Sequence, residues 1–129
     1  MPGWVGDIER QTLDNETFRT VVFTGGNMQL TVMSIEPGDD IGAEVHDGHD
    51  QFLRIESGSA RVELGGSDGA PQDVHEVEDD WAVIVPSGTW HNVINTGSEP
   101  LKVYSLYAPP EHPDGTVHRT KADALAAEH

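Results

Sequence analysis

Seven short apolar runs, each separated from the next by turn residues, constrain the fold of this chain more than any other feature. The runs are rich in β-branched and aromatic residues, and Gly, Pro, Asp or Ser interrupts the sequence between them. They cover residues 20–23, 28–35, 51–55, 60–64, 81–85, 91–95 and 101–107. Several short strands with regular turn punctuation are typical of a sandwich or a jelly-roll β-barrel. The sequence therefore predicts an all-β fold.

The length of the chain fits one such domain. A chain of 129 residues corresponds to one ordinary domain, so we expect residues 1–129 to form a single unit with a barrel core at about 18–110. The prolines within 109–113 disfavour regular strand pairing, which predicts a C-terminal segment, 109–129, that wraps over the barrel. Only residues 121–128 have the Ala-rich composition of a helix. Residues 65–71 are predicted to form a flexible loop.

Two polar stretches, one in each half of the chain, carry the candidate functional residues. The first reads Gly38-x5-Glu44-x-His46-x4-Gln51-x6-Gly58, and the second reads Pro86-x-Gly88-x2-His91-x3-Asn95. Side chains alternate along a strand, so Glu44 and His46 are predicted to point to one face. A tight turn at 47–50 is predicted to return Gln51 beside His46, and a turn at 86–89 to start a strand with His91 pointing inward. These side chains could then surround one metal ion.

These stretches resemble the two motifs of the cupin superfamily, usually written G(X)5HXH(X)3-4E(X)6G and G(X)5PXG(X)2H(X)3N. The spacings agree throughout, but Glu44 stands where the first histidine is usual, Gln51 where the glutamate is usual and Asp80 where the second motif begins with glycine. Asp80 is expected to adopt the turn conformation that favours glycine. The resemblance covers about residues 15–125 and is similar to small single-domain cupins labelled mannose-6-phosphate isomerase-like. It implies a jelly-roll β-barrel with a short C-terminal helical tail.

The resemblance also implies one divalent transition metal bound by Glu44, His46, Gln51 and His91. Two imidazoles and a carboxylate suit Fe, Mn, Ni or Zn, with the amide as a weak fourth ligand. Three alternatives stay open. Glu44 could be an exposed strand residue, Gln51 could be a hydrogen-bond partner of a ligand, and His49 could swing inward to replace Glu44 or Gln51.

Composition excludes several other classes of site and partner. The chain has no cysteine, so disulfides and thiolate ligands are ruled out. The formal net charge is −16, from 23 acidic and 7 basic residues, and there is no basic patch to bind nucleic acid or an anionic membrane. This acidity predicts adaptation to a high-salt cytoplasm. No apolar run has the length of a membrane span and no signal-peptide pattern is present, which predicts a cytoplasmic protein.

Two function classes are compatible with these features. The first is a metalloenzyme of the isomerase or dioxygenase type, acting on a small hydroxy-carbonyl, sugar-derived or diketone-like substrate. The second is a non-catalytic domain that binds or senses a metal or a small ligand. The sequence identifies no catalytic residue, and fold alone does not separate the two classes. By analogy with small cupins we expect a homodimer, and the aromatic residues Phe52, Trp81 and Trp90 are expected to fill the core or a subunit contact.

Overall fold

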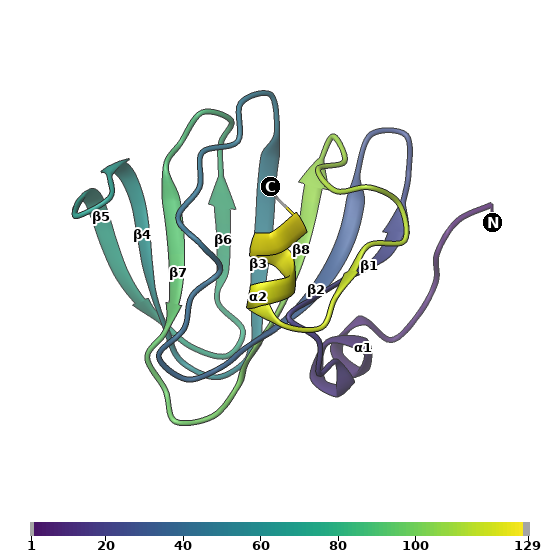
Figure 1. Ribbon diagram of the computed structural model, residues 1–129, viewed down its shortest axis with the longest axis horizontal. Coiled ribbons are helices and arrows are strands. Elements are labelled where there is room, and N and C mark those ends of the chain that lie inside the picture. The colour runs from purple at the N-terminus through teal and green to yellow at the C-terminus, as the bar shows by residue number, and fades with distance from the viewer. Residues whose placement is uncertain (1, 128–129) are drawn as a thin grey trace.

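Two antiparallel sheets carry the fold, as seen in a computed structural model that describes residues 2–127 (Figure 1). The larger sheet has the strand order β6-β3-β8-β2-β1-β9, and the smaller has the order β5-β4-β7. The strands are β1 (Arg19–Thr24), β2 (Gln29–Ile35), β3 (Asp50–Ser57), β4 (Ala60–Ser67), β5 (Ala70–Val77), β6 (Ala82–Val85), β7 (His91–Asn95), β8 (Leu101–Ala108) and β9 (Val117–His118). The helices are α1 (Ile8–Asp14) and α2 (Lys121–Ala127).

All seven predicted runs form strands, which confirms the all-β jelly-roll prediction, but the two sheets are not closed into a barrel. Within residues 2–127 the connector 36–49 adds only two isolated bridges, Asp40 to Ile94 and Glu44 to His91. Pro37 and glycines with positive φ interrupt this connector, so it cannot run as a continuous strand along the smaller sheet. The result is an open two-sheet sandwich.

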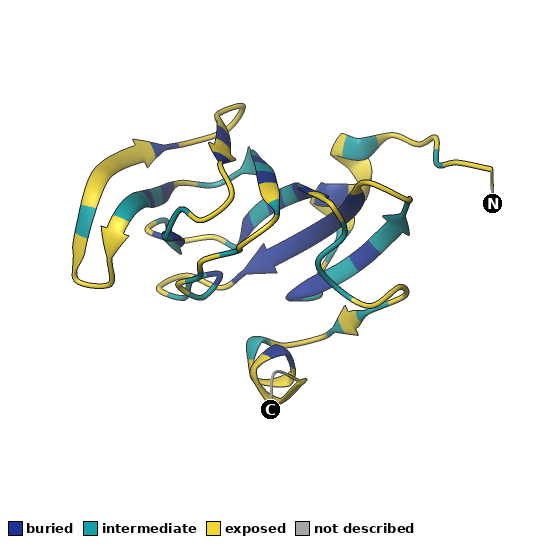
Figure 2. Cartoon of the chain, turned by 90° about the horizontal axis from the view of Figure 1, so that it is seen from above, coloured by how far each residue is buried: buried dark blue, intermediate teal, exposed yellow. Residues whose placement is uncertain are grey.

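The core lies between the two sheets and is strongest around β2. All seven residues of β2 are buried, and the strand pairs with β1 on one side and β8 on the other (Figure 2). In β3 the side chains alternate, so Gln51 shares the buried face with Leu53 and Ile55. Each fully buried aliphatic side chain contributes about 1.5–3 kcal/mol relative to exposure. The same alternation that builds the core therefore directs Gln51 inward.

Three elements were not predicted from the sequence, namely α1, β5 and the two-residue strand β9. The expected loop over 65–71 is the end of a β4–β5 hairpin, in which Gly69 takes a positive φ of 79° at the turn. Strand β5 is mostly exposed and polar, so it has no apolar run and forms through its ladder with β4. Helix α1 is short, and its N-cap residue Asp7 accepts a hydrogen bond from the backbone of Arg10 at 3.1 Å.

The C-terminal segment follows β8, passes through β9 and ends in α2, in front of the larger sheet (Figure 1). The buried side chain of Gln29 holds this segment in place through hydrogen bonds to its backbone. Its Oε1 accepts hydrogen bonds from the backbone nitrogens of Glu111 (3.2 Å) and His112 (3.0 Å), and its Nε2 donates to the carbonyl of His112 at 2.8 Å. The predicted helix appears as α2, and its expected last residue, Glu128, lies outside the described residues.

Two local expectations have different outcomes. Asp80 has a φ of 74°, the left-handed conformation expected for a residue that replaces glycine. The aromatic residues do not fill the core, because Trp81 is 49% exposed and Phe52 and Trp90 are only partly buried, and the alternative of a subunit contact stays a prediction. Among residues 2–127, no helix combines the length and apolar character needed to cross a membrane.

Candidate metal centre

Backbone pairing between the connector and β7 brings the two sequence motifs together. The amide of Glu44 donates to the carbonyl of His91 at 3.0 Å, and the amide of His91 donates back at 2.9 Å. The amide of Gly88 also donates to the carbonyl of His46 at 2.9 Å. The prediction of a strand at 44–46 that forms a hairpin with β3 is therefore wrong. Positive φ values at Gly42 and Gly48 turn this segment toward β7 instead.

Glu44, His46 and His91 form a cluster in which one ligand atom from each residue lies within 4.8 Å of the others. Oε2 of Glu44 is 2.5 Å from Nε2 of His46, and the imidazole rings of His46 and His91 are 5.4 Å apart. His91 is fully buried, whereas Glu44 and His46 are partly buried. A single metal ion could therefore contact all three residues.

Two of the buried atoms without a hydrogen-bond partner are Nε2 of His91, in this cluster, and Oε1 of Gln51, whose strand partner Tyr107 packs against His46. Nδ1 of His91 lies 3.3 Å from the carbonyl of Thr89, which directs the Nδ1 proton to that oxygen and leaves a lone pair on Nε2. Nε2 of Gln51 donates to Ser105 at 3.5 Å, which leaves the amide oxygen free. An unsatisfied buried polar group costs about 1–3 kcal/mol. A bound metal ion would satisfy Nε2 of His91, so the donor set of the cluster fits such an ion.

A carboxylate that the sequence analysis missed supports the cluster from the C-terminal segment. Oε1 of Glu111 is 3.5 Å from Nδ1 of His46, and Oε2 is 3.3 Å from Nε2 of His49. Nδ1 of His49 is 2.8 Å from the carbonyl of Pro109. Both nitrogens of His49 are thus engaged outside the cluster, and the structure does not place this residue as a replacement ligand. The only sequence signal for Glu111 was its position beside His112 in a segment expected to cover the sheets.

Comparison with known proteins identifies the family. A sequence model of the cupin domain matches residues 31–107. The chain belongs to the cupin family. It is 57% identical over 125 residues to protein YrkC of Bacillus subtilis (strain 168), a match that covers 97% of this chain and 67% of that protein. It is 36% identical over 115 residues to protein L612 of Acanthamoeba polyphaga mimivirus, covering 88% and 70% of the two chains.

A solved structure matches this cupin over nearly its whole length. The crystal structure of BH2720 from Bacillus halodurans has a TM-score of 0.93 and 52% sequence identity. The match covers 95% of this chain and 93% of that one. A close relative therefore shares the fold in which the motif residues of this chain lie.

The electrostatics of this cupin's cluster follow from burial and from the Glu44–His46 pair. Burial alone would raise the pKa of Glu44, but the interaction with His46 outweighs it and lowers that pKa. The same interaction raises the pKa of His46. Burial lowers the pKa of His91, which favours the neutral imidazole. These shifts favour an ion pair between Glu44 and His46 and a neutral His91 in the metal-free cluster, and the neutral imidazole is the form that binds a metal.

Beside the cluster lies an aromatic column from His46 through Tyr107 to His112. The ring of Tyr107 packs edge-on against His46 at 5.9 Å and against His112 at 5.2 Å between centroids. Burial raises the pKa of Tyr107, so its hydroxyl stays protonated. Burial also lowers the pKa of His112 to about 4. Tyr107 and His112 are therefore both uncharged at neutral pH.

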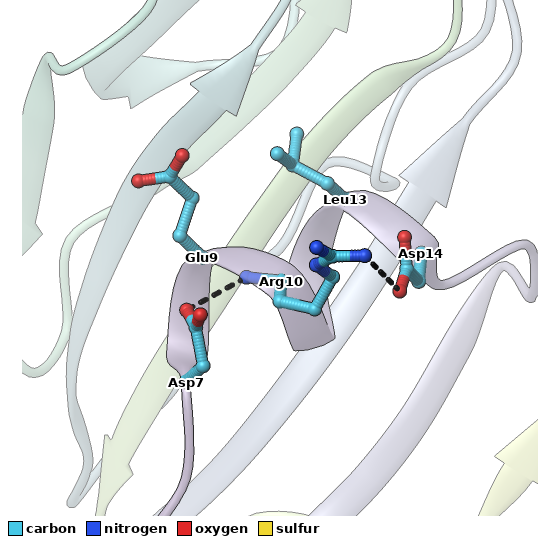
Figure 3. Close-up of a pocket in the computed structure, with 5 residues that line it drawn as sticks. All are labelled: Asp7, Glu9, Arg10, Leu13 and Asp14. Carbon is cyan, nitrogen blue, oxygen red and sulfur yellow. Dashed lines mark hydrogen bonds and ion pairs between the residues drawn. The ribbon is translucent and has the colours of Figure 1, made fainter.

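A hollow of ≈ 460 Å³ lies beside α1 and is lined by none of the cluster residues (Figure 3). Its polar groups interact with one another. Asp7 caps the backbone of Arg10, and the guanidinium of Arg10 lies 3.9 Å from the carboxylate of Asp14. The contact between Asp7 and Arg10 caps the start of α1. The described residues around this hollow form no cluster of metal ligands.

Proposed function

We propose that this cupin binds one divalent transition-metal ion and is a metalloenzyme of the isomerase or dioxygenase type that acts on a small hydroxy-carbonyl or diketone-like molecule. The ligands would be Glu44, His46 and His91, with the amide oxygen of Gln51 as a fourth. The observation that carries this proposal is the convergence of three ligand atoms within 4.8 Å beside the unpartnered Nε2 of His91. Two histidines and a carboxylate suit Fe, Mn, Ni or Zn.

A bound ion of this kind supplies Lewis-acid polarisation of a substrate oxygen. The residues around it supply the remaining requirements. Glu111 faces Nδ1 of His46 and so orients the ring with Nε2 toward the cluster. Thr89 does the same for His91 through its carbonyl. Both rings are therefore oriented with Nε2 toward the cluster, and His46 would bind a metal ion through Nε2 after losing the proton that it shares with Glu44.

The space for a small molecule lies next to the cluster. A cavity of ≈ 270 Å³ is lined by Glu44 on one side and by residues of α2 on the other. This volume is below that of common drug-sized sites, which begin at about 300 Å³. The cavity therefore suits a substrate of few heavy atoms. Helix α2, which lines it, would help to exclude bulk water.

The decisive experiment is elemental analysis of protein purified without a chelator or a metal-affinity tag, with oxygen consumption measured across diketones and hydroxy-carbonyl compounds. Near-stoichiometric iron with oxygen uptake supports the dioxygenase type. Near-stoichiometric zinc, nickel or manganese with substrate isomerisation and no oxygen uptake supports the isomerase type. Metal without any turnover across the panel favours the binding or sensor role. Less than about a tenth of an equivalent of metal after reconstitution overturns the metal centre, because ligands of this type bind such ions strongly.

A further inference from the structure

Arg19, the first residue of β1, is a buried cation with no carboxylate within ion-pair distance in the part of the chain that the structure describes. The residue is 4% exposed, and its guanidinium lies over the ring of Phe18 at 5.3 Å from the centroid. Nη1 is 3.4 Å from Nδ1 of His118, and Nε has no hydrogen-bond partner. Within residues 2–127 no carboxylate forms an ion pair with it. A buried charge normally requires a partner, so this one calls for an explanation.

The other arginines for which the structure shows ion pairs follow the usual pattern. Arg54 pairs with Glu56 and Asp80 at 3.0 Å each, and Arg61 pairs with Glu63 at 3.0 Å. The chain has 23 acidic residues against 7 Lys and Arg, so a carboxylate partner is readily available elsewhere on this protein. Arg19 differs from these arginines in being both buried and unpaired.

Arg19 lines two cavities. One is the ≈ 270 Å³ cavity that Glu44 also lines, and the second, of ≈ 160 Å³, is lined by His112, Thr116 and His118 with no carboxylate among its described lining residues. The first cavity contains a second cation, Lys121, but its ammonium group already pairs with Asp39 at 2.8 Å and with Asp40. Arg19 is therefore the cation of this cavity that has no carboxylate within ion-pair distance among the described residues, and its charge acts at longer range on Glu44, whose pKa it helps to lower.

Glu44 connects this cation to the metal chemistry. It lines the same cavity as Arg19, and it belongs to the cluster with His46 and His91. A free Glu44 carboxylate would repel a second anion in so small a space, whereas a metal ion on the cluster would neutralise it. An anion held by Arg19 and a metal held by Glu44 would therefore favour each other.

We propose, building on the proposed metal centre, that Arg19 anchors the carboxylate of a small hydroxy or oxo monocarboxylate whose adjacent oxygen faces the metal cluster at Glu44. The planar guanidinium matches a carboxylate with two parallel hydrogen bonds. A monoanion balances the single positive charge of Arg19, whereas a phosphate dianion would bring excess negative charge into a chain of net charge −16. The cavity size also limits the ligand to a few heavy atoms.

The test is calorimetric titration with glycolate, L-lactate and pyruvate, with the neutral lactamide and inorganic phosphate as comparison ligands. Each is titrated into metal-loaded and metal-stripped protein. The variants are Arg19→Gln, which removes the charge, and Arg19→Lys, which keeps the charge but removes the planar group that forms two parallel hydrogen bonds. Arg54→Gln is the matched control, because Arg54 lies on another strand and is paired at the surface. Circular dichroism and metal content are measured for every protein.

At least one carboxylate is expected to bind the metal-loaded protein, more tightly than it binds the metal-stripped protein and more tightly than lactamide or phosphate bind. Arg19→Gln should weaken that binding about ten- to a hundredfold, the usual loss of a charged hydrogen bond. Arg19→Lys should give a smaller loss. Arg54→Gln should match the unaltered protein, and metal content should stay the same in all of them.

The outcomes separate this anion site from the metal centre. Equal carboxylate affinity in Arg19→Gln and the unaltered protein, equal binding of lactamide, preferential binding of phosphate, or no binding of any of the three acids would each overturn the Arg19 proposal and leave the metal result standing. If the protein takes up no metal, carboxylate binding to the metal-free form that depends on Arg19 would still support the anion site. If Arg19→Gln does not fold, the Arg19→Lys comparison decides in the same way.

Discussion

Glu44 and His91 face each other across an isolated antiparallel bridge and exchange two backbone hydrogen bonds, of 3.0 and 2.9 Å. This bridge fixes the backbone of one candidate ligand against that of another before any ion is bound. The side chains of the two residues then belong to the same cluster with His46. A preorganised cluster of this kind loses little conformational freedom when a metal binds.

Replacing His91 by alanine should abolish stoichiometric metal binding and leave the fold intact. The side chain contributes an unpartnered Nε2 to the cluster, whereas its backbone bridge to Glu44 does not depend on the side chain. His46→Ala should have the same effect. Elemental analysis after reconstitution checks both variants, with His75→Ala as the matched control on the exposed strand β5. Full metal occupancy in both His46→Ala and His91→Ala would contradict the proposed ligand set.

Replacing Gln51 by leucine should weaken metal binding without weakening the fold. The amide oxygen is buried and unpartnered, so an apolar side chain of similar size removes an unsatisfied group, and the free energy of unfolding of the metal-free protein should stay equal or rise. Metal affinity should fall about tenfold or more if the oxygen is a ligand or supports one. Gln51→Glu should restore affinity but destabilise the metal-free protein, because it buries a second carboxylate near Glu44. An unchanged affinity in Gln51→Leu would exclude Gln51 from the site.

Acidification should destabilise the metal-free protein through His112. The unfolded chain takes up a proton on this histidine near pH 6.5, whereas burial lowers its pKa in the folded protein to about 4. The unfolded state therefore binds more protons between these values, and the stability that is complete above pH 6.5 is lost as the pH falls toward 4. At pH 4.5 the loss from this group is about 2–3 kcal/mol.

Chemical denaturation in the presence of a chelator at pH 7.5 and pH 4.5 measures this effect. His112→Gln has no group that titrates in this range, so the drop in stability between the two pH values should be smaller in the variant than in the unaltered protein. Hydrogen bonds from Gln29 hold the backbone of His112 and do not require its ring. The same drop in both proteins would show that His112 does not carry the pH dependence.

The strands and the identity of three clustered residues could be predicted from the sequence because both depend on local pattern. Apolar runs mark strands wherever one face is buried, and the motif spacing pointed to Glu44, His46 and His91. The polar strand β5 was not predicted, because its stability comes from pairing with β4 rather than from an apolar face. The two isolated bridges of the connector were not predicted either, because single bridges produce no repeating pattern of apolar residues in the sequence.

Glu111 and Arg19 could not be found in this way, because their importance depends on how distant segments come together. Glu111 reaches His46 only because Gln29, 82 residues away in sequence, holds the backbone of the C-terminal segment. Arg19 begins an ordinary strand, and its lack of an acidic partner becomes visible only when β9 and α2 enclose it. Burial without a partner is a property of the assembled fold, not of a sequence window.

The expected homodimer stays a prediction, and the edge strand β6 is the surface we propose for it. Ile84 is 67% exposed and Trp81 is 49% exposed at the free edge of the larger sheet. Exposed apolar edges favour pairing with another chain. Ile84→Lys should therefore shift a dimer toward monomer in analytical ultracentrifugation. Leu13→Lys, which changes an exposed leucine on α1 by the same charge, should have no effect. A monomeric unaltered protein, or equal behaviour of the two variants, would contradict the prediction.

Salt should stabilise this protein if its acidity reflects a high-salt environment. With a formal net charge of −16, repulsion among surface carboxylates opposes the compact state. Raising KCl from about 0.1 to 1 M shortens the Debye length from about 10 to 3 Å and screens that repulsion. The free energy of unfolding, measured by urea denaturation, should rise over this range. Asp73→Asn combined with Glu76→Gln removes two exposed charges on β5 and should reduce the response to salt. A free energy of unfolding that stays constant or falls as KCl rises would show that charge repulsion does not limit the stability of this protein.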